Sequence, residues 1–234
     1  MSNIIIDVNS IKTYPKIFLD FCRENKGCLL NSFLSKDDRL ETGSGLFDYI
    51  NEMLSNISFM CIHVSRILDL KTIKTKGLLN PSKHLDISLI IMEGIKNKIT
   101  DENYRLVFDE LNNRIQNDNK YKTFHFVIGS IDDITLANGF LMLENYGGEL
   151  LEDVFSTLKL KDAYNEVRFI GIPVAIFFEL PKEQLKDYFL SDIYDYMIKK
   201  VIYNNDDHFF RESCIYDSVS KESIIDVKEL HDYE

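Results

Sequence analysis

One histidine, one tyrosine and two glutamates have the surroundings of residues that do chemistry. His63 ends an apolar run, Tyr146 precedes a pair of glycines, Glu149 follows that pair, and Glu212 begins a short run with apolar residues. Histidine and tyrosine side chains can hold a ligand by hydrogen bonding and stacking. A carboxylate can stabilise a developing positive charge or accept a proton. These four residues are therefore the first candidates for a binding or catalytic site.

The residues around His63 predict a strand followed by a short helix. Residues 57–64 are apolar and β-branched, as expected for a buried strand. Asp69 is a suitable N-cap, apolar residues follow at helical spacing, and Gly77 is a suitable helix stop. We therefore expect His63 to leave the sheet at the strand end, where a ligand could meet it. A hydrogen-bonded structural histidine is the alternative interpretation.

Residues 62–78 resemble the opening of an NAD-using ADP-ribosyltransferase, including the DNA-modifying toxin branch of that superfamily. There, the first core strand commonly ends in His-x-Ser/Thr and is followed by Asn/Asp-Leu-x-x-Ile-x-x-x-Gly-Leu. This chain matches those positions with His63, Ser65, Asp69-Leu70, Ile73 and Gly77-Leu78. The resemblance implies NAD as the co-substrate and a site of the His-Tyr-Glu type, whose three residues lie in that order on three separate strands.

The resemblance also implies a role for each candidate. Residues 211–227 are similar to the family's final hairpin, whose penultimate core strand begins with the catalytic glutamate, so Glu212 is the first choice and Glu149 the second. Tyr146 is the candidate for the ring that packs on nicotinamide, although a half-buried turn tyrosine is the plainer interpretation. Glu149 is otherwise an accessory carboxylate or a helix N-terminal charge. The expected catalytic residues are Glu212, His63 and Tyr146, and the expected cofactor-binding residues are His63, Ser65, Tyr146, Glu149 and Arg211.

The rest of the chain predicts an α+β domain, because strands are scattered among helices without regular alternation. Residues 140–146 should lead into a turn at Gly147–Gly148, and residues 212–216 and 224–227 should form a closing hairpin. The resemblance implies an ADP-ribosyltransferase-like split β-sheet core with a helical insertion, spanning residues 57–234. Residues 1–56 are expected to be a helical N-terminal extension packed on that core.

Composition limits where the protein acts and what it binds. With 234 residues, 45% of them hydrophobic, the chain can bury a sizeable core. The cysteines lack Cys-x-x-Cys spacing and the histidines lack paired spacing, so we expect reduced thiols and no metal site. Neither a signal peptide nor a membrane-spanning run is visible, which predicts a soluble cytoplasmic protein without a membrane partner. The formal charge of -11 disfavours non-specific binding to phosphate backbones.

Two functions follow from these observations. The first is an intracellular NAD-dependent ADP-ribosyltransferase, a glycosyltransferase that modifies a protein or nucleic acid as a toxin or antiviral effector, with an antitoxin or regulatory protein as a further partner. The second is a non-enzymatic interaction or inhibitor protein, antitoxin-like or anti-defence, whose acidic surface meets a basic partner. NAD binding with nicotinamide release distinguishes them. The acceptor, whether protein, DNA, RNA or water, is not encoded in any motif.

Overall fold

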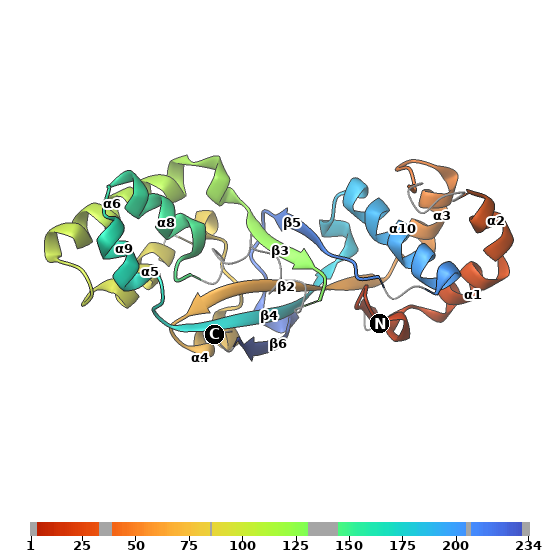
Figure 1. The fold of residues 1–234 in the computed structure, drawn as a ribbon, viewed down its shortest axis with the longest axis horizontal. Coiled ribbons are helices and arrows are strands. Elements are labelled where there is room, and N and C mark those ends of the chain that lie inside the picture. Colours follow the sequence, from red (N-terminus) through yellow and green to blue (C-terminus); the bar gives the residue numbers. More distant parts are fainter. Residues whose placement is uncertain (1–3, 33–38, 85, 131–144, 205–206, 231–234) are drawn as a thin grey trace. The chain divides into compact units, whose positions relative to one another are not determined.

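The computed structural model describes residues 4–32, 39–84, 86–130, 145–204 and 207–230, and the chain divides into two compact units (Figure 1). Unit 1 comprises Met1–Cys61, Val127–Ser130 and Glu179–Ser213. Unit 2 comprises Ile62–Phe126, Ile131–Phe178 and Cys214–Glu234. The expected N-terminal extension, residues 1–56, falls within unit 1 together with a segment from late in the chain.

The described residues form one six-stranded sheet, in the order β5-β3-β2-β4-β6, with β1 pairing in parallel with β2. β2 and β4 are nearly continuous apolar runs and are mostly buried, which is typical of central strands. β6 pairs antiparallel with β4, with a register shift at Phe177/Phe178. The strands are β1 (Ile4–Ile6), β2 (Ile57–Ile67), β3 (Phe124–Ile128), β4 (Ile172–Pro181), β5 (Arg211–Ile215) and β6 (Ile224–Glu229).

In unit 1, α10 packs against α1, α2 and α3 (Figure 1). Phe18, Phe47 and Tyr194 are buried between these helices. The hydroxyl of Ser44 caps α3 by accepting from the backbone N–H of Phe47 at 3.2 Å. The helical elements are η1 (Ile11–Thr13), α1 (Lys16–Glu24), α2 (Lys26–Ser32), α3 (Gly45–Met53), η5 (Lys182–Gln184) and α10 (Asp187–Tyr203).

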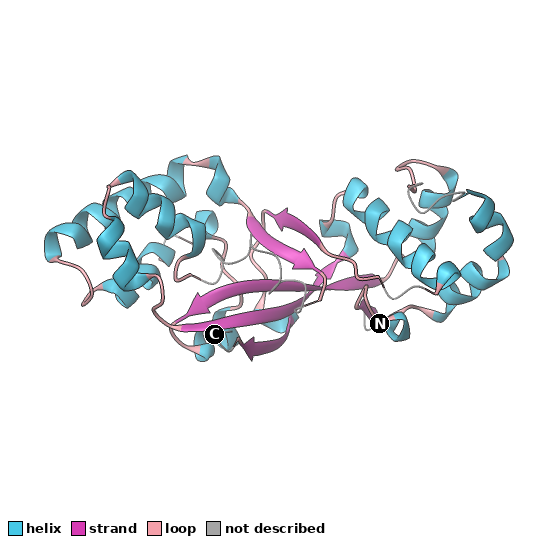
Figure 2. Cartoon of the chain, in the orientation of Figure 1, coloured by secondary structure: helices cyan, strands magenta, loops and turns pink. Residues whose placement is uncertain are grey.

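In unit 2, the helices α5, α6, α8 and α9 surround a core of their own (Figure 2). Met92, Leu111, Leu151 and Val154 are fully buried in it. The helical elements are α4 (Leu70–Lys76), η2 (Pro81–Lys83), α5 (Ile87–Ile95), α6 (Asp101–Asn117), η3 (Asn119–Lys122), α8 (Gly148–Thr157), α9 (Lys161–Val167) and η6 (Lys221–Ser223). No described helix combines the length and the apolar character that a membrane span requires.

The mixture of helices with one mixed sheet confirms the predicted α+β class. The predicted closing hairpin is wrong, because β5 pairs with β3 and β6 pairs with β4, so three strands separate them in the sheet. The connection between β5 and β6 instead passes the end of α4, where Val219 forms an antiparallel bridge with Leu78. Of the residues expected to lead into the glycine turn, positions 140–144 lie outside the described residues.

Candidate functional site

His63 lies inside β2, and not at its end, because the strand continues to Ile67. The expectation that His63 leaves the sheet is therefore wrong. Its Nδ1 lies 2.9 Å from the backbone oxygen of His125 in β3. Since a carbonyl only accepts, Nδ1 carries the proton in this tautomer and Nε2 is an acceptor. Burial lowers the pKa of His63 to about 4 despite that hydrogen bond, so the imidazole is neutral at pH 7.

The segment after His63 has the predicted capped helix. Ser65 follows on β2 and is half-buried. Asp69 caps α4 by accepting from the backbone N–H of Lys71 at 2.9 Å. Gly77 ends the helix with φ of 74°, and a Cβ at this position would lie 2.2 Å from the carbonyl oxygen of Val219. A glycine is required here for both its conformation and the close approach of the second backbone.

In unit 2, the backbone at the end of β2 meets the backbone that leads into the glycine turn, at Arg66 and Tyr146. These residues form a parallel bridge, and the backbone N–H of Tyr146 donates to the oxygen of Arg168 at 2.8 Å. Gly147 and Gly148 then turn the chain into α8 with φ of 72° and 53°, as the glycine pair predicts. The glycine turn therefore begins beside the end of β2, on the strand that carries His63 and Ser65.

The side chain of Tyr146 lies in the helical core of unit 2. It is 4% exposed, and its hydroxyl donates to the backbone oxygen of Ile91 at 2.9 Å. A Cβ on Gly94 would lie 2.4 Å from the tyrosine hydroxyl, so the helix packs directly on the ring. Burial raises the pKa of this phenol. This placement does not support stacking of Tyr146 on a nicotinamide ring, because the ring already packs against α5.

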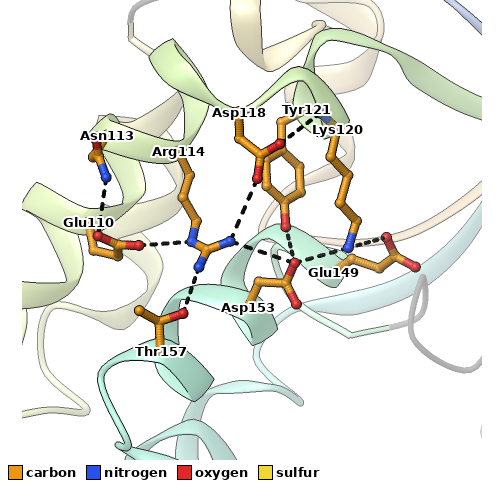
Figure 3. A network of polar contacts seen from close by, with 9 residues as sticks. All are labelled: Glu110, Asn113, Arg114, Asp118, Lys120, Tyr121, Glu149, Asp153 and Thr157. Atoms are coloured by element: carbon orange, nitrogen blue, oxygen red, sulfur yellow. Dashed lines mark hydrogen bonds and ion pairs between the residues drawn. The ribbon is translucent and has the colours of Figure 1, made fainter.

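Glu149 belongs to a charged network that joins α6, η3 and α8 (Figure 3). Arg114 lies at its centre and contacts Glu110 at 2.9 Å, the hydroxyl of Thr157 at 2.6 Å, and Asp118 and Asp153 at 3.8 Å. Lys120 contacts Asp153 at 2.9 Å and Glu149 at 3.3 Å. Glu149 stands in the first turn of α8, which matches the expected helix N-terminal charge.

The expected catalytic glutamate lies in the other unit. Glu212 and Arg211 are exposed at the start of β5, and both belong to unit 1, whereas His63, Tyr146 and Glu149 belong to unit 2. Within unit 1, the guanidinium of Arg211 lies 3.8 Å from the carboxylate of Asp192. The convergence of Glu212 with His63, and the expected NAD-binding role of Arg211, stay predictions.

A cluster that sequence reasoning missed lies beside the Arg66–Tyr146 bridge. Arg66 donates two hydrogen bonds of 2.9 Å, to the backbone oxygens of Phe169 and Gly171. The guanidinium of Arg66 lies 5.5 Å from the centroid of the Phe169 ring, and that of Arg168 lies 4.4 Å from it. Phe169 is nevertheless 59% exposed. Arg66 and Phe169 are 103 residues apart in sequence, and no local sequence pattern predicts their contact.

No group of three or more histidine, cysteine, aspartate or glutamate side chains is arranged to hold a metal ion among the described residues. Comparison of the chain with protein-family models, with curated proteins and with solved structures gave no match. The functional argument therefore rests on the residues and strands of this chain and on the resemblance of residues 62–78 described above.

Proposed function

We propose that this chain is an ADP-ribosyltransferase of the His-Tyr-Glu type, which transfers ADP-ribose from NAD to a macromolecular acceptor as a toxin or antiviral effector. The supporting observation is the strand order β5-β3-β2. β2 carries His63, β3 is its neighbour, and β5 begins with Arg211 and Glu212. In the resembling family, a first, a middle and a late core strand come together around nicotinamide, and the proposal rests on this correspondence.

The proposed reaction breaks the bond between nicotinamide and C1 of its ribose. The electron pair of that bond leaves with nicotinamide, which departs as a neutral molecule, and the ribose acquires oxocarbenium character. The Glu212 carboxylate stabilises this positive charge and takes the proton of the acceptor nucleophile as the new bond to C1 forms. A neutral His63 whose Nε2 is an acceptor suits a ribose hydroxyl, which can donate to it.

The ring that faces nicotinamide in this proposal is not Tyr146, which the resemblance implied. Tyr146 packs in the helical core, whereas β3, the strand between β2 and β5, carries the exposed His125. The backbone oxygen of His125 is the acceptor for His63, so the two histidines are neighbours across the β2–β3 pair. We therefore assign the nicotinamide-facing ring to His125, so the proposed site departs from the His-Tyr-Glu pattern at its middle position, and Tyr146 holds the glycine turn against the core.

The test is nicotinamide release from NAD by the purified chain and by Glu212→Gln. The amide keeps the shape of the side chain but not its charge, so release should fall on the order of 10²-fold or more, with NAD binding and thermal stability retained. Glu229→Gln, also exposed on a strand, is the matched control and should be unaffected. Absence of release from the wild-type chain would favour the non-enzymatic interaction protein. Wild-type release from Glu212→Gln, with loss in Glu149→Gln, would move the catalytic role to Glu149.

A further inference from the structure

The segment between α9 and β4 presents an aromatic ring to solvent with two guanidinium groups beside it. Phe169 is 59% exposed, although Arg66 and Arg168 both lie close to its ring. An apolar ring of this size is normally more stable when it turns away from solvent into the nearby core. Here its backbone is held by the two hydrogen bonds from Arg66 to Phe169 and Gly171. The position of the ring is therefore built into the fold.

Gly171 contributes to the same rigid placement. Its φ is 82°, and a Cβ there would lie 2.4 Å from the backbone oxygen of Ile67. The segment that bears Phe169 is thus pressed against the end of β2 at a point where only glycine fits. Arg66, which lies on β2, also donates a hydrogen bond to the backbone oxygen of Gly171. Preorganised side chains of this kind lose little entropy when a ligand binds.

Arg168 has the character of a binding residue. Within the described part of the chain, no carboxylate lies within ion-pair distance of its guanidinium, and its buried Nε–H has no hydrogen-bond acceptor. A partly buried cation in this state is stabilised by an anion that accepts from its outer nitrogens. The Arg66 guanidinium beside the same ring adds a second positive charge to the local field.

We propose that Arg168 and Phe169 form a subsite for a nucleotide, with the base stacked on the Phe169 ring and the phosphate bound by Arg168. A phosphate matches the donor geometry of a guanidinium, and a base matches an exposed aromatic face. Neither an apolar ligand nor a carboxylate alone uses both features. Arg66 acts as a positioning residue, because its hydrogen bonds hold the segment that bears the ring.

The subsite lies beside the residues of the proposed reaction in unit 2. Arg66 follows His63 and Ser65 on β2, and the oxygen of Arg168 accepts from the backbone N–H of Tyr146. Two sources could supply the nucleotide, namely the adenosine half of NAD and a nucleic-acid acceptor. Both sources rest on the proposed function, whereas the nucleotide subsite itself can be measured without it.

The experiment is calorimetric titration of the full chain with AMP, adenosine and inorganic phosphate. Phe169→Ala should weaken AMP binding about tenfold or more, while Phe169→Tyr, which keeps the ring, should retain it. Arg168→Gln should weaken AMP binding and leave adenosine binding unchanged, because only AMP carries the phosphate. Tyr188→Ala is the matched control, since Tyr188 is also 59% exposed with a lysine ammonium 5.9 Å from its ring centroid.

Two further titrations, with NAD and with a short single-stranded oligothymidylate, identify the source. Weaker NAD binding by both variants supports the adenosine half of NAD, and weaker oligonucleotide binding alone supports a nucleic-acid acceptor. The proposal is overturned if AMP does not bind, or if Phe169→Ala and Arg168→Gln bind it as the wild-type chain does. Nicotinamide release from the same preparations separates the two proposals: release with no effect of these variants on AMP rejects only the subsite. Ring-dependent AMP binding without release rejects only the proposed reaction.

Discussion

Two arginine clusters of unit 2 use the same side chain for different purposes. Arg114 is surrounded by acceptors on α6, on α8 and at the junction between α6 and η3. Together with Lys120 it neutralises four acidic side chains (Figure 3). Arg168 instead lies on an exposed ring, with no carboxylate partner among the described residues. The first arrangement closes a network and stabilises packing. The second leaves charge and aromatic surface for something outside the chain, so the number of internal partners distinguishes a structural arginine from a binding one.

The largest expected effect comes from removing the centre of the closed network. Arg114→Met should lower the free energy of unfolding by about 2–3 kcal/mol, because Glu110, Asp118 and Asp153 are left facing one another without the cation. Urea unfolding measures this change. Arg168→Met is the matched control and should cost less than about 1 kcal/mol. Equal losses in the two variants would contradict the distinction between the clusters.

The second effect concerns His63, which lies on β2, the strand that also carries Arg66. Its pKa of about 4 in the folded protein lies below the ordinary value of 6.5, so the unfolded chain binds more protons between these pH values. Stability should therefore fall as the pH drops from 6.5 towards 4. His63→Gln should flatten this part of the stability profile. A profile identical to that of the wild-type chain would show that the imidazole is not held in its neutral form.

A smaller response to acid is expected from the closed network. Burial would raise the pKa of Asp153, but hydrogen bonds from Tyr121 and Lys120 and the charges of Lys120 and Arg114 outweigh it and lower the pKa. Its contribution is present above the ordinary pKa of 3.8 and is lost as the pH falls through the lower folded value. Asp153→Asn should remove that loss, so wild-type and variant stabilities should converge at the most acid pH. Thermal unfolding between pH 2 and 5, relative to that at neutral pH, measures the convergence.

Local signals in the sequence predicted individual strands, helices and turns. The apolar run 57–64, the Asp69 cap and the Gly77 stop correctly indicate β2 and α4, and the glycine pair correctly indicates the turn into α8. Each of these features depends on residues that are adjacent in the chain, where capping and backbone conformation decide the structure.

Long-range pairing could not be predicted in the same way. The polar turn between residues 216 and 224 suggests a hairpin, yet β5 and β6 find partners elsewhere in the sheet. Tyr146 next to two glycines suggests a ligand-facing turn, but its ring packs in the helical core and its hydroxyl donates to backbone carbonyls of α5. The residues around Arg66 and those around Phe169 do not predict a contact between them, because only the packing of distant segments brings them together. The residues that were misassigned or missed from the sequence are therefore those whose positions depend on tertiary contacts.

The smallest expected effect gives the sharpest distinction. Phe169→Ala removes an exposed ring whose main neighbours are two guanidinium groups, so the free energy of unfolding should change by less than about 0.5 kcal/mol. The backbone hydrogen bonds from Arg66 do not involve the ring and should persist. Chemical unfolding of this variant, measured beside that of Tyr188→Ala, provides the value and its control. A loss above about 1.5 kcal/mol would mean that the ring supports the fold of unit 2, which would make the cluster of Arg66, Arg168 and Phe169 structural in the same sense as the Arg114 network.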